Sequence, residues 1–199
     1  MQLELPDVEI RLRIEDGPPM DDEQLFEFCQ DNRLVRIERE ASGEIVVMPL
    51  PGCETSHRAC DTISQFGDWA IRDGRGFSLA NCGFLLPDGV MRGPHISWVL
   101  KSRLANLTKR QKQRFLPLCP DFVIEFISPF DRLNKVQAKM VEWIDNGASL
   151  AWLIDADRRT VYIYRPRREP EQLVNVDHVD GEGPVAGFRL ELSDIWQEL

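Results

Sequence analysis

The chain has 199 residues, of which 43% are hydrophobic and 29% charged, and its net charge is −9. These values are typical of a folded domain with one core, and they argue against a protein that coats itself with nucleic acid. No apolar run approaches the roughly 20 residues that cross a membrane, and the N-terminus has no export signal. Five scattered cysteines without a CxxC pair argue against a disulfide framework and a zinc knuckle. We therefore expect a soluble, cytoplasmic protein with reduced thiols and no membrane partner.

The first half of the chain predicts strands and two helices. Alternating apolar residues predict a strand over residues 8–14, and Asp21 or Asp22 can cap a helix that runs to Gln30. Strands at residues 34–38 and 44–48 flank a Ser-Gly turn and predict a hairpin. A long helix over residues 54–72 is followed by short strands at residues 76–80, 83–86 and 95–100.

The segment from residue 101 to residue 114 carries six of the 24 basic residues and none of the 33 acidic ones. On an acidic protein, this asymmetry predicts either a solvated helix surface or a local contact with phosphate groups. The six candidates for nucleic-acid binding are Lys101, Arg103, Lys109, Arg110, Lys112 and Arg114.

A strand predicted over residues 121–127 carries a carboxylate in its middle. Alternation places Glu125 on the same face as Val123 and Ile127, which is largely apolar. A carboxylate there is costly to bury unless a metal, a cation or water meets it.

The next helix is expected from Asp131 to Asn146, with Gly147 as its C-cap. At about 100° per residue, Lys139 lies closer than Lys135 to the apolar stripe of this helix, so Lys139 is better placed to reach the sheet. A strand carboxylate with a nearby lysine suits metal-dependent phosphodiester cleavage. The same pattern also fits a carboxylate at the edge of the core and lysines that extend to solvent.

The last part of the chain predicts a second hairpin over residues 150–155 and 160–165, then edge strands at residues 172–176 and 188–190 and a closing helical turn. This order of elements describes an α/β domain in which helices pack on a mixed sheet, rather than a run of βαβ units. The sequence lacks GxGxxG, Walker and GxSxG motifs, so no motif supports a nucleotide-binding or a serine-hydrolase function.

Three blocks of sequence resemble a known family. They read RIEREASGEIVVMPLPGCET, GFLLPDGVMRGPHISWV, and LCPDFVIEFISPFDRLNKVQAKMVEWIDNGASLAWLID followed by VYIYRP. These blocks are similar to the Uma-two (Uma2) family of endonucleases, a branch of the restriction-endonuclease-like PD-(D/E)XK superfamily. The resemblance implies one restriction-endonuclease-like domain over residues 1–199, with an N-terminal β/α extension (1–33), a nuclease-like core (34–166) and C-terminal edge elements (167–199).

The resemblance also implies divalent-metal-dependent hydrolysis of DNA, with Mg or Mn as the metal. Glu125 resembles the acidic residue of the second half-motif. Ile127 stands where the motif's lysine would be, so Lys139 on the following helix is the candidate for the catalytic lysine. Glu54 resembles the helix carboxylate that many members place beside the metal.

The sequence departs from the family pattern at His95. The family usually has Ser-Pro-Asp before this strand, whereas this chain has Gly93-Pro94-His95. Mg²⁺ prefers oxygen ligands, while manganese, iron and zinc accept an imidazole more readily. The implied ligands are therefore Glu125, His95 and Glu54, with His95 altering metal preference or marking a site that no longer cuts.

Two other classes of function stay open at this point. One is a degenerate nuclease fold that binds DNA or a protein partner. The other is a soluble dimer whose role is unrelated to nucleic acid, and a homodimer is compatible with each of these functions.

Overall fold

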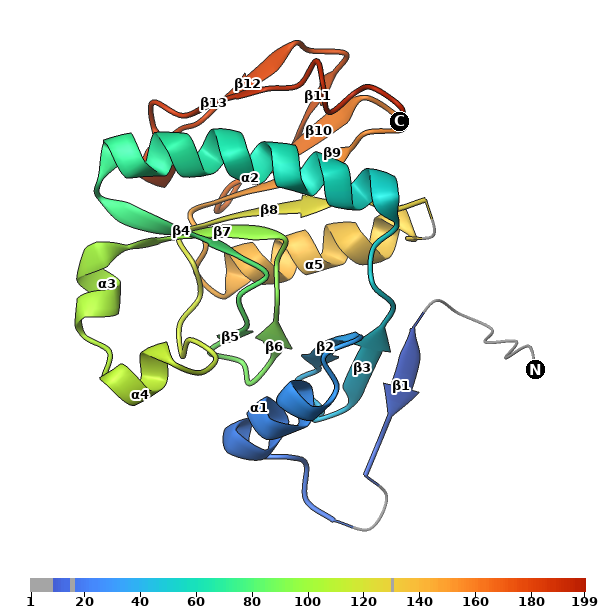
Figure 1. Cartoon of the computed structure of the whole chain (residues 1–199), viewed down its shortest axis with the longest axis vertical. Coiled ribbons are helices and arrows are strands. Elements are labelled where there is room, and N and C mark those ends of the chain that lie inside the picture. The colour runs from blue at the N-terminus through green and yellow to red at the C-terminus, as the bar shows by residue number, and fades with distance from the viewer. Residues whose placement is uncertain (1–8, 15–16, 130) are drawn as a thin grey trace.

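The computed structural model describes residues 9–14, 17–129 and 131–199. Within this part, the strands form sheets of six, five and two strands (Figure 1). The helices are α1 (Asp22–Asp31), α2 (Cys53–Asp73), α3 (Lys101–Ala105), α4 (Lys109–Lys112) and α5 (Leu133–Asp145), with a 3-10 turn at Gly183–Val185. None of the described helices is long and apolar enough to cross a membrane.

The six-stranded sheet has the order β11-β10-β9-β8-β7-β4. Its strands are β4 (Gly76–Ala80), β7 (Ile96–Leu100), β8 (Phe122–Phe126), β9 (Leu150–Asp155), β10 (Thr160–Tyr164) and β11 (Glu171–Val174). Strands β8 and β9 are parallel and the other neighbours are antiparallel. The parallel pair is joined by α5, because a parallel crossover needs a connection long enough to return along the sheet.

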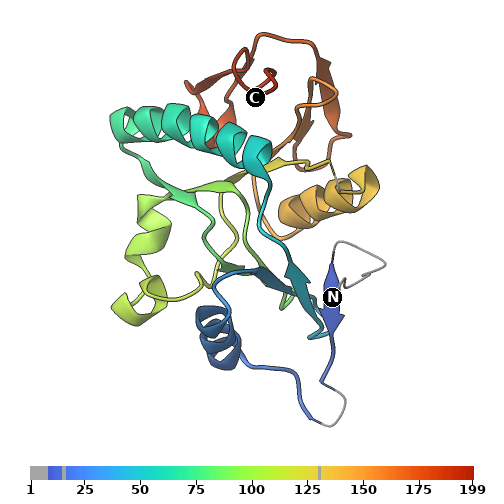
Figure 2. The ribbon, with the colours of Figure 1, turned by 45° about the vertical axis from the view of Figure 1, so that its right-hand side comes forward.

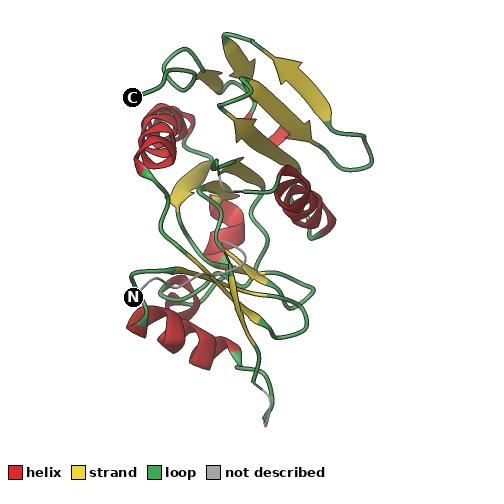
Figure 3. Ribbon diagram, turned by 90° about the vertical axis from the view of Figure 1, so that its right-hand side faces the viewer, coloured by secondary structure: helices red, strands yellow, loops and turns green. Residues whose placement is uncertain are grey.

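Helices α2 and α5 cover opposite faces of this sheet, as Figure 3 shows. Phe66 of α2 packs in the same core cluster as Phe122 of β8, whereas Trp143 of α5 packs in a second cluster with Val123. The predicted alternation along β8 is therefore confirmed. Both faces of the strand are covered, which explains why every residue of β8 is buried.

The five-stranded sheet has the order β1-β3-β2-β6-β5 and lies beside the first one (Figure 2). Its strands are β1 (Ile10–Leu12), β2 (Arg36–Arg39), β3 (Ile45–Met48), β5 (Phe84–Leu85) and β6 (Met91–Arg92). The predicted hairpin is confirmed, with β2 and β3 antiparallel. Helix α1 packs on this sheet through Leu25, and Asp21 caps it by accepting a hydrogen bond from the Gln24 amide at 2.8 Å.

The remaining strands, β12 (His178–Asp180) and β13 (Arg189–Glu191), form a two-stranded sheet beside α2. The Leu190 and Phe188 side chains at this sheet belong to the cluster under α2. The expected closing turn is held by hydrogen bonds from the Trp196 amide to the Leu192 carbonyl, 2.9 Å long, and from the Gln197 amide to the Asp194 carbonyl, 3.3 Å long. All five cysteines are free thiols.

The structure corrects several sequence-based boundaries. The mixed sheet is the six-stranded one, and the remaining strands form two further sheets. Strands β6 and β12 were not predicted, and the bounds of α3 and α4 within the basic stretch were not given by the sequence. Strand β1 covers three residues of the predicted seven, and Val8 lies outside the described residues. Helix α5 begins two residues later than expected, because the Asp131 carboxylate accepts a hydrogen bond from the Ser128 amide at 2.8 Å and holds a turn before the helix.

Candidate functional site

Glu125 and His95 lie side by side where the two large sheets meet. Strands β7 and β8 are antiparallel with Ile96 opposite Ile124, so the residue before β7 falls opposite Glu125. Nδ1 of His95 lies 2.5 Å from Oε2 of Glu125. Both residues are buried, since 8% of the His95 surface and 2% of the Glu125 surface are exposed.

Lys139 reaches this pair from α5. Its ammonium group lies 3.0 Å from Oε1 of Glu125 and 2.7 Å from Oε1 of Glu38. The structure thus brings together Glu125, His95 and Lys139, three residues chosen from the sequence. It also adds Glu38, which was not predicted.

Glu38 lies on β2 and is buried. Arg92 of β6 approaches it at 3.7 Å and pairs with Glu40 and Glu142 at 2.7 Å each. Cations and carboxylates therefore alternate between the five-stranded sheet and α5. The sequence carried one signal for this, because alternation in β2 puts Arg36 and Glu38 on the same face.

The neighbouring cations keep both buried carboxylates ionised. Burial alone would raise the pKa of Glu125, but the Lys139 ammonium and the hydrogen bond from His95 outweigh it and hold this pKa well below its usual range. Burial has the same opposing effect on Glu38, whose pKa is lowered mainly by Lys139 and Arg92. For Lys139, burial would lower the pKa, and the two carboxylates raise it instead.

Two contacts indicate which ring nitrogen of His95 carries the proton. A guanidinium only donates hydrogen bonds, so Nε2, which lies 3.3 Å from Nη1 of Arg36, is an acceptor. Nδ1 then donates to Glu125. The Phe126 amide also approaches Nδ1, but at 3.5 Å this contact is much weaker than the 2.5 Å contact with Glu125. The lone pair of Nε2 therefore faces Arg36.

His95 borders two neighbouring pockets. The Glu125 pocket has a volume of about 360 Å³, and its wall includes Glu125, Lys139 and Arg36. The α2 pocket has a volume of about 500 Å³ and is lined by Arg36, His95 and the first turn of α2. Arg36 and His95 belong to both walls, so they stand at the junction of the two pockets.

Glu54, the third predicted metal ligand, lines the α2 pocket rather than the Glu125 pocket. It lies in the first turn of α2, its side chain is 39% exposed, and Arg58 approaches it at 3.6 Å. The structure therefore places Glu54 beside the wall that contains His95, but it does not group Glu54 with Glu125.

Whether the predicted ligands fit a divalent ion depends on what the two oxygens of Glu125 already contact. Oε2 accepts the short hydrogen bond from His95. Oε1 faces the Lys139 ammonium at 3.0 Å without a well-aligned hydrogen bond. Mg²⁺ needs about six oxygen ligands, whereas no three His, Cys, Asp or Glu side chains in the described segments are grouped to hold an ion. In this arrangement, Glu125, His95 and Glu54 do not fit a divalent ion together.

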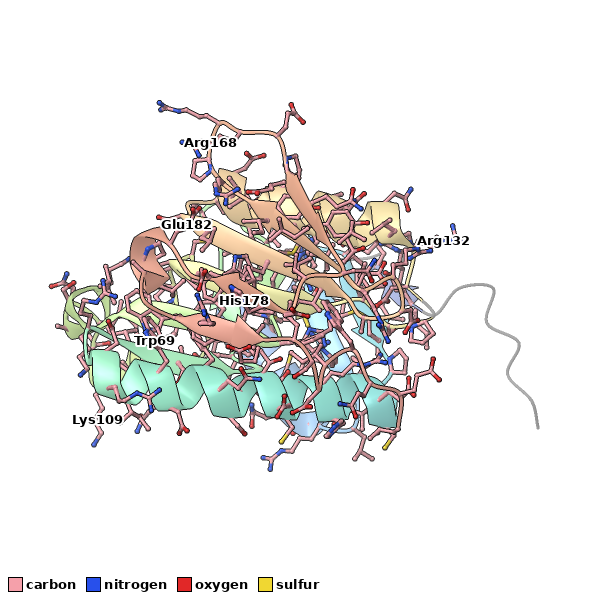
Figure 4. The ribbon with its side chains drawn as sticks, turned by 90° about the horizontal axis from the view of Figure 1, so that it is seen from above. Trp69, Lys109, Arg132, Arg168, His178 and Glu182 are labelled. Atoms are coloured by element: carbon pink, nitrogen blue, oxygen red, sulfur yellow. The ribbon has the colours of Figure 1, made fainter. Side chains whose placement is uncertain are left out.

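The basic stretch lies at the other end of β7. His95 precedes this strand and Lys101 follows it, so six residues of extended chain, about 20 Å, separate them. Figure 4 shows Lys109 and the pocket-lining Arg132 at opposite sides of the molecule.

Four of the six basic side chains have partners within the chain. Lys101 donates to the Gly74 carbonyl, and Arg103 pairs with Asp121. Arg110 and Arg114 both pair with Glu23. Lys109 and Lys112 are exposed.

Comparisons with known proteins agree with this architecture. A crystal structure of a "putative nuclease belonging to DUF820" from Anabaena variabilis matches with a TM-score of 0.69 at 23% identity, over 80% of this chain and 89% of that chain. This likeness confirms the restriction-endonuclease-like fold, a mixed sheet flanked by helices. No curated protein matches the chain. The family model Uma2, described as "Putative restriction endonuclease", matches residues 22–193. Because this match spans most of the chain, the protein belongs to the Uma2 family.

Proposed function

We propose that this protein hydrolyses phosphodiester bonds of DNA at the pockets around Glu125, His95 and Lys139. One observation carries the proposal: an imidazole and an ammonium group each lie within 3.0 Å of the same buried carboxylate, in the wall of a pocket. The family description, a restriction endonuclease, supports DNA as the substrate.

Each of these residues has a role that follows from its surroundings. Glu125 holds the His95 ring through its hydrogen bond. Lys139 places a positive charge beside the reacting phosphate, where a partly dry site strengthens its effect. Arg36, at the junction of the pockets, contacts the phosphate that is bound there.

Two features implied by the resemblance stay predictions. One is the ligand set of Glu125, His95 and Glu54 for Mg or Mn, although these side chains are not grouped to hold an ion in the arrangement described above. The other is the contact of the basic stretch, residues 101–114, with the DNA backbone.

Nicking of supercoiled plasmid by wild type, Glu125→Ala and Lys139→Ala tests the proposal. Either substitution should lower the rate by about 10²-fold or more, since Lys139→Ala removes the positive charge placed at the reacting phosphate and Glu125→Ala removes the hydrogen bond that holds the His95 ring. Glu191→Ala, an exposed carboxylate on β13, is the matched control and should leave the rate unchanged. Circular dichroism would confirm that all variants are folded. A wild-type rate for folded Glu125→Ala would refute the assignment.

A second candidate function is binding without cleavage. The observation that favours it is that Lys139 lies between Glu38 and Glu125, where it already neutralises carboxylates that a metal ion would otherwise bind. In that case, fluorescence anisotropy would detect binding of duplex DNA or of a protein partner. No nicking would be seen with Mg²⁺, Mn²⁺ or EDTA.

A further inference from the structure

Part of the α2 pocket wall is apolar and takes no part in the proposed chemistry. The pocket has a volume of about 500 Å³, within the roughly 300–1,000 Å³ of pockets that hold small ligands. Met48 and Leu50 line it from the end of β3 and the loop that follows, and Phe126 and Val136 line it from β8 and α5. Figure 1 shows that α2 and α5 both begin at this end of the six-stranded sheet. An apolar surface therefore adjoins the site at which the phosphate is proposed to react.

Leu50 lines this pocket although 58% of its surface is exposed. It stands between Pro49 and Pro51, which line the pocket as well, and each proline ring fixes its own φ near about −65°. A side chain that is carried on such a restricted loop loses little conformational freedom when a ligand covers it. The loop is therefore suited to pack against an apolar surface of a ligand.

The formal charges of the pocket wall cancel among the described residues. The wall contains three carboxylates and three basic groups, which are Glu9, Glu54 and Asp131, and Arg36, Arg132 and Lys135. A further phosphate group would gain little from such a wall, whereas a flat and uncharged group meets no net repulsion there. A nucleobase is a group of this kind.

Arg36 connects the α2 pocket to the reacting phosphate. It lines both pockets, and its Nη2 donates to the Gly93 carbonyl at 2.6 Å, which fixes the side chain at their junction. Across residues 9–14, 17–129 and 131–199, it forms no ion pair with a carboxylate. Guanidinium groups bind phosphate oxygens well. A phosphate bound to Arg36 would bring the nucleoside attached to it to the pocket that Leu50 lines.

We propose that the α2 pocket binds one unpaired nucleoside of a DNA strand, with its phosphate at Arg36 and its base packed against Leu50. This inference rests on the proposed nuclease function and names its substrate as single-stranded or locally opened DNA. In a duplex, neighbouring bases cover both faces of each base, and only the base edges are open in the grooves. A base must leave the stack before it can enter a pocket, and a single strand offers such bases at the lowest cost.

Fluorescence anisotropy with three labelled probes of equal length tests this inference. The probes are an oligothymidylate strand, a strand in which abasic tetrahydrofuran units replace all of its nucleosides, and the thymidylate strand paired with oligoadenylate. Wild-type protein should bind the thymidylate strand about 5-fold or more tightly than the abasic strand, which has the same charge but no bases. It should bind the duplex more weakly than the thymidylate strand.

Leu50→Ala should reduce the preference for the thymidylate strand and leave the affinity for the abasic strand unchanged. Ile71→Ala is the matched control, because it shortens an exposed aliphatic side chain near the other end of α2 and should bind all three probes like wild type. Each titration is run with EDTA and again with Ca²⁺. Electrophoresis of the strands afterwards shows whether they are intact, so that binding is measured separately from cutting.

The outcomes separate this inference from the proposed function. Equal affinity of wild type for the thymidylate and abasic strands would show that only the backbone is bound, and it would overturn the inference even if plasmid is nicked. Tighter binding of the duplex, an equal loss on all three probes in Leu50→Ala, or no binding of any probe in either buffer would overturn it as well. A preference for the thymidylate strand that depends on Leu50, in a protein that nicks no plasmid, would overturn the nuclease function and leave the nucleoside pocket standing.

Discussion

Lys139 of α5 and Glu38 of β2 form an ion pair of 2.7 Å that joins the helix under the six-stranded sheet to the five-stranded sheet. Glu125 shares the same ammonium group at 3.0 Å. One cation therefore compensates two buried carboxylates from different sheets. Its loss would leave those carboxylates facing each other in a medium of low dielectric constant.

We expect Lys139→Met to destabilise the fold strongly. Removing one partner of a buried ion pair typically costs about 3–5 kcal/mol in the free energy of unfolding, because the remaining charge is uncompensated. Lys112→Met, which alters an exposed lysine of α4, should change it by less than about 0.5 kcal/mol. Urea denaturation measures both. The double variant Glu38→Gln/Lys139→Met should recover part of the loss, and a loss as large as in Lys139→Met alone would show that charge is not the cause.

A second prediction concerns acid stability. Glu38 and Glu125 have lowered pKa values in the folded protein, whereas in the unfolded chain they titrate near 4.5. As the pH falls below about 4.5, the unfolded state binds protons that the folded state does not. The stability contributed by these two carboxylates is therefore complete above that pH and is lost progressively as the pH falls.

The measurement is the urea midpoint between about pH 6 and pH 3. As the pH falls, two such carboxylates together lower the free energy of unfolding by at most about 2.7 kcal/mol per pH unit. Glu38→Gln/Glu125→Gln should show a shallower acid slope than wild type. Equal slopes in the two proteins would mean that other carboxylates control acid unfolding.

The sequence predicted most elements because their signals are local. The alternation in β8 and the apolar stripe of α5 locate Glu125 and Lys139 without any long-range information. The approach of Lys139 to Glu125 followed from helical geometry. The position of His95 opposite Glu125 was not predictable from periodicity, since it depends on the register between two strands about 30 residues apart in the chain.

Glu38 was not predicted, for the same reason. Its neighbours in the chain mark it as an ordinary strand residue, and only the packing of β2 against α5 brings it to Lys139. Strand β6 is two residues long, which is too short for an alternation signal. Arg92, which supports Glu38 from β6, was therefore also not predicted.

Four of the six basic side chains in residues 101–114 have partners within the chain, so fewer of them are available to contact DNA. Among the six basic side chains, Lys109 and Lys112 are exposed and make no ion pair or hydrogen bond within the described residues, so they should account for most of any phosphate contact there. Each phosphate contact contributes about 0.9 to the slope of log affinity against log salt. Lys109→Glu/Lys112→Glu should therefore reduce that slope by about 2, as measured by fluorescence anisotropy with duplex DNA.

The matched control for this pair is Arg167→Glu/Arg168→Glu, two exposed residues in the turn between β10 and β11. This change has the same effect on net charge. Equal loss of affinity in both double variants would show that net charge, rather than contact through α4, governs binding.

The last prediction tests the packing that supports the site. Gly76 begins β4, and a Cβ atom there would lie 2.3 Å from the indole of Trp98, a fully buried residue of β7. Gly76→Ala must displace that ring from the core, and overpacking of this kind costs about 1–3 kcal/mol. Gly67→Ala in the middle of α2 is the matched control, since a Cβ there has no atom within 4 Å. It should stabilise the protein by about 0.5–1 kcal/mol, because alanine favours a helix over glycine. In thermal unfolding, the midpoint temperature should be lower than that of wild type for Gly76→Ala and higher for Gly67→Ala. Shifts of the same sign in the two variants would contradict the packing described around Trp98.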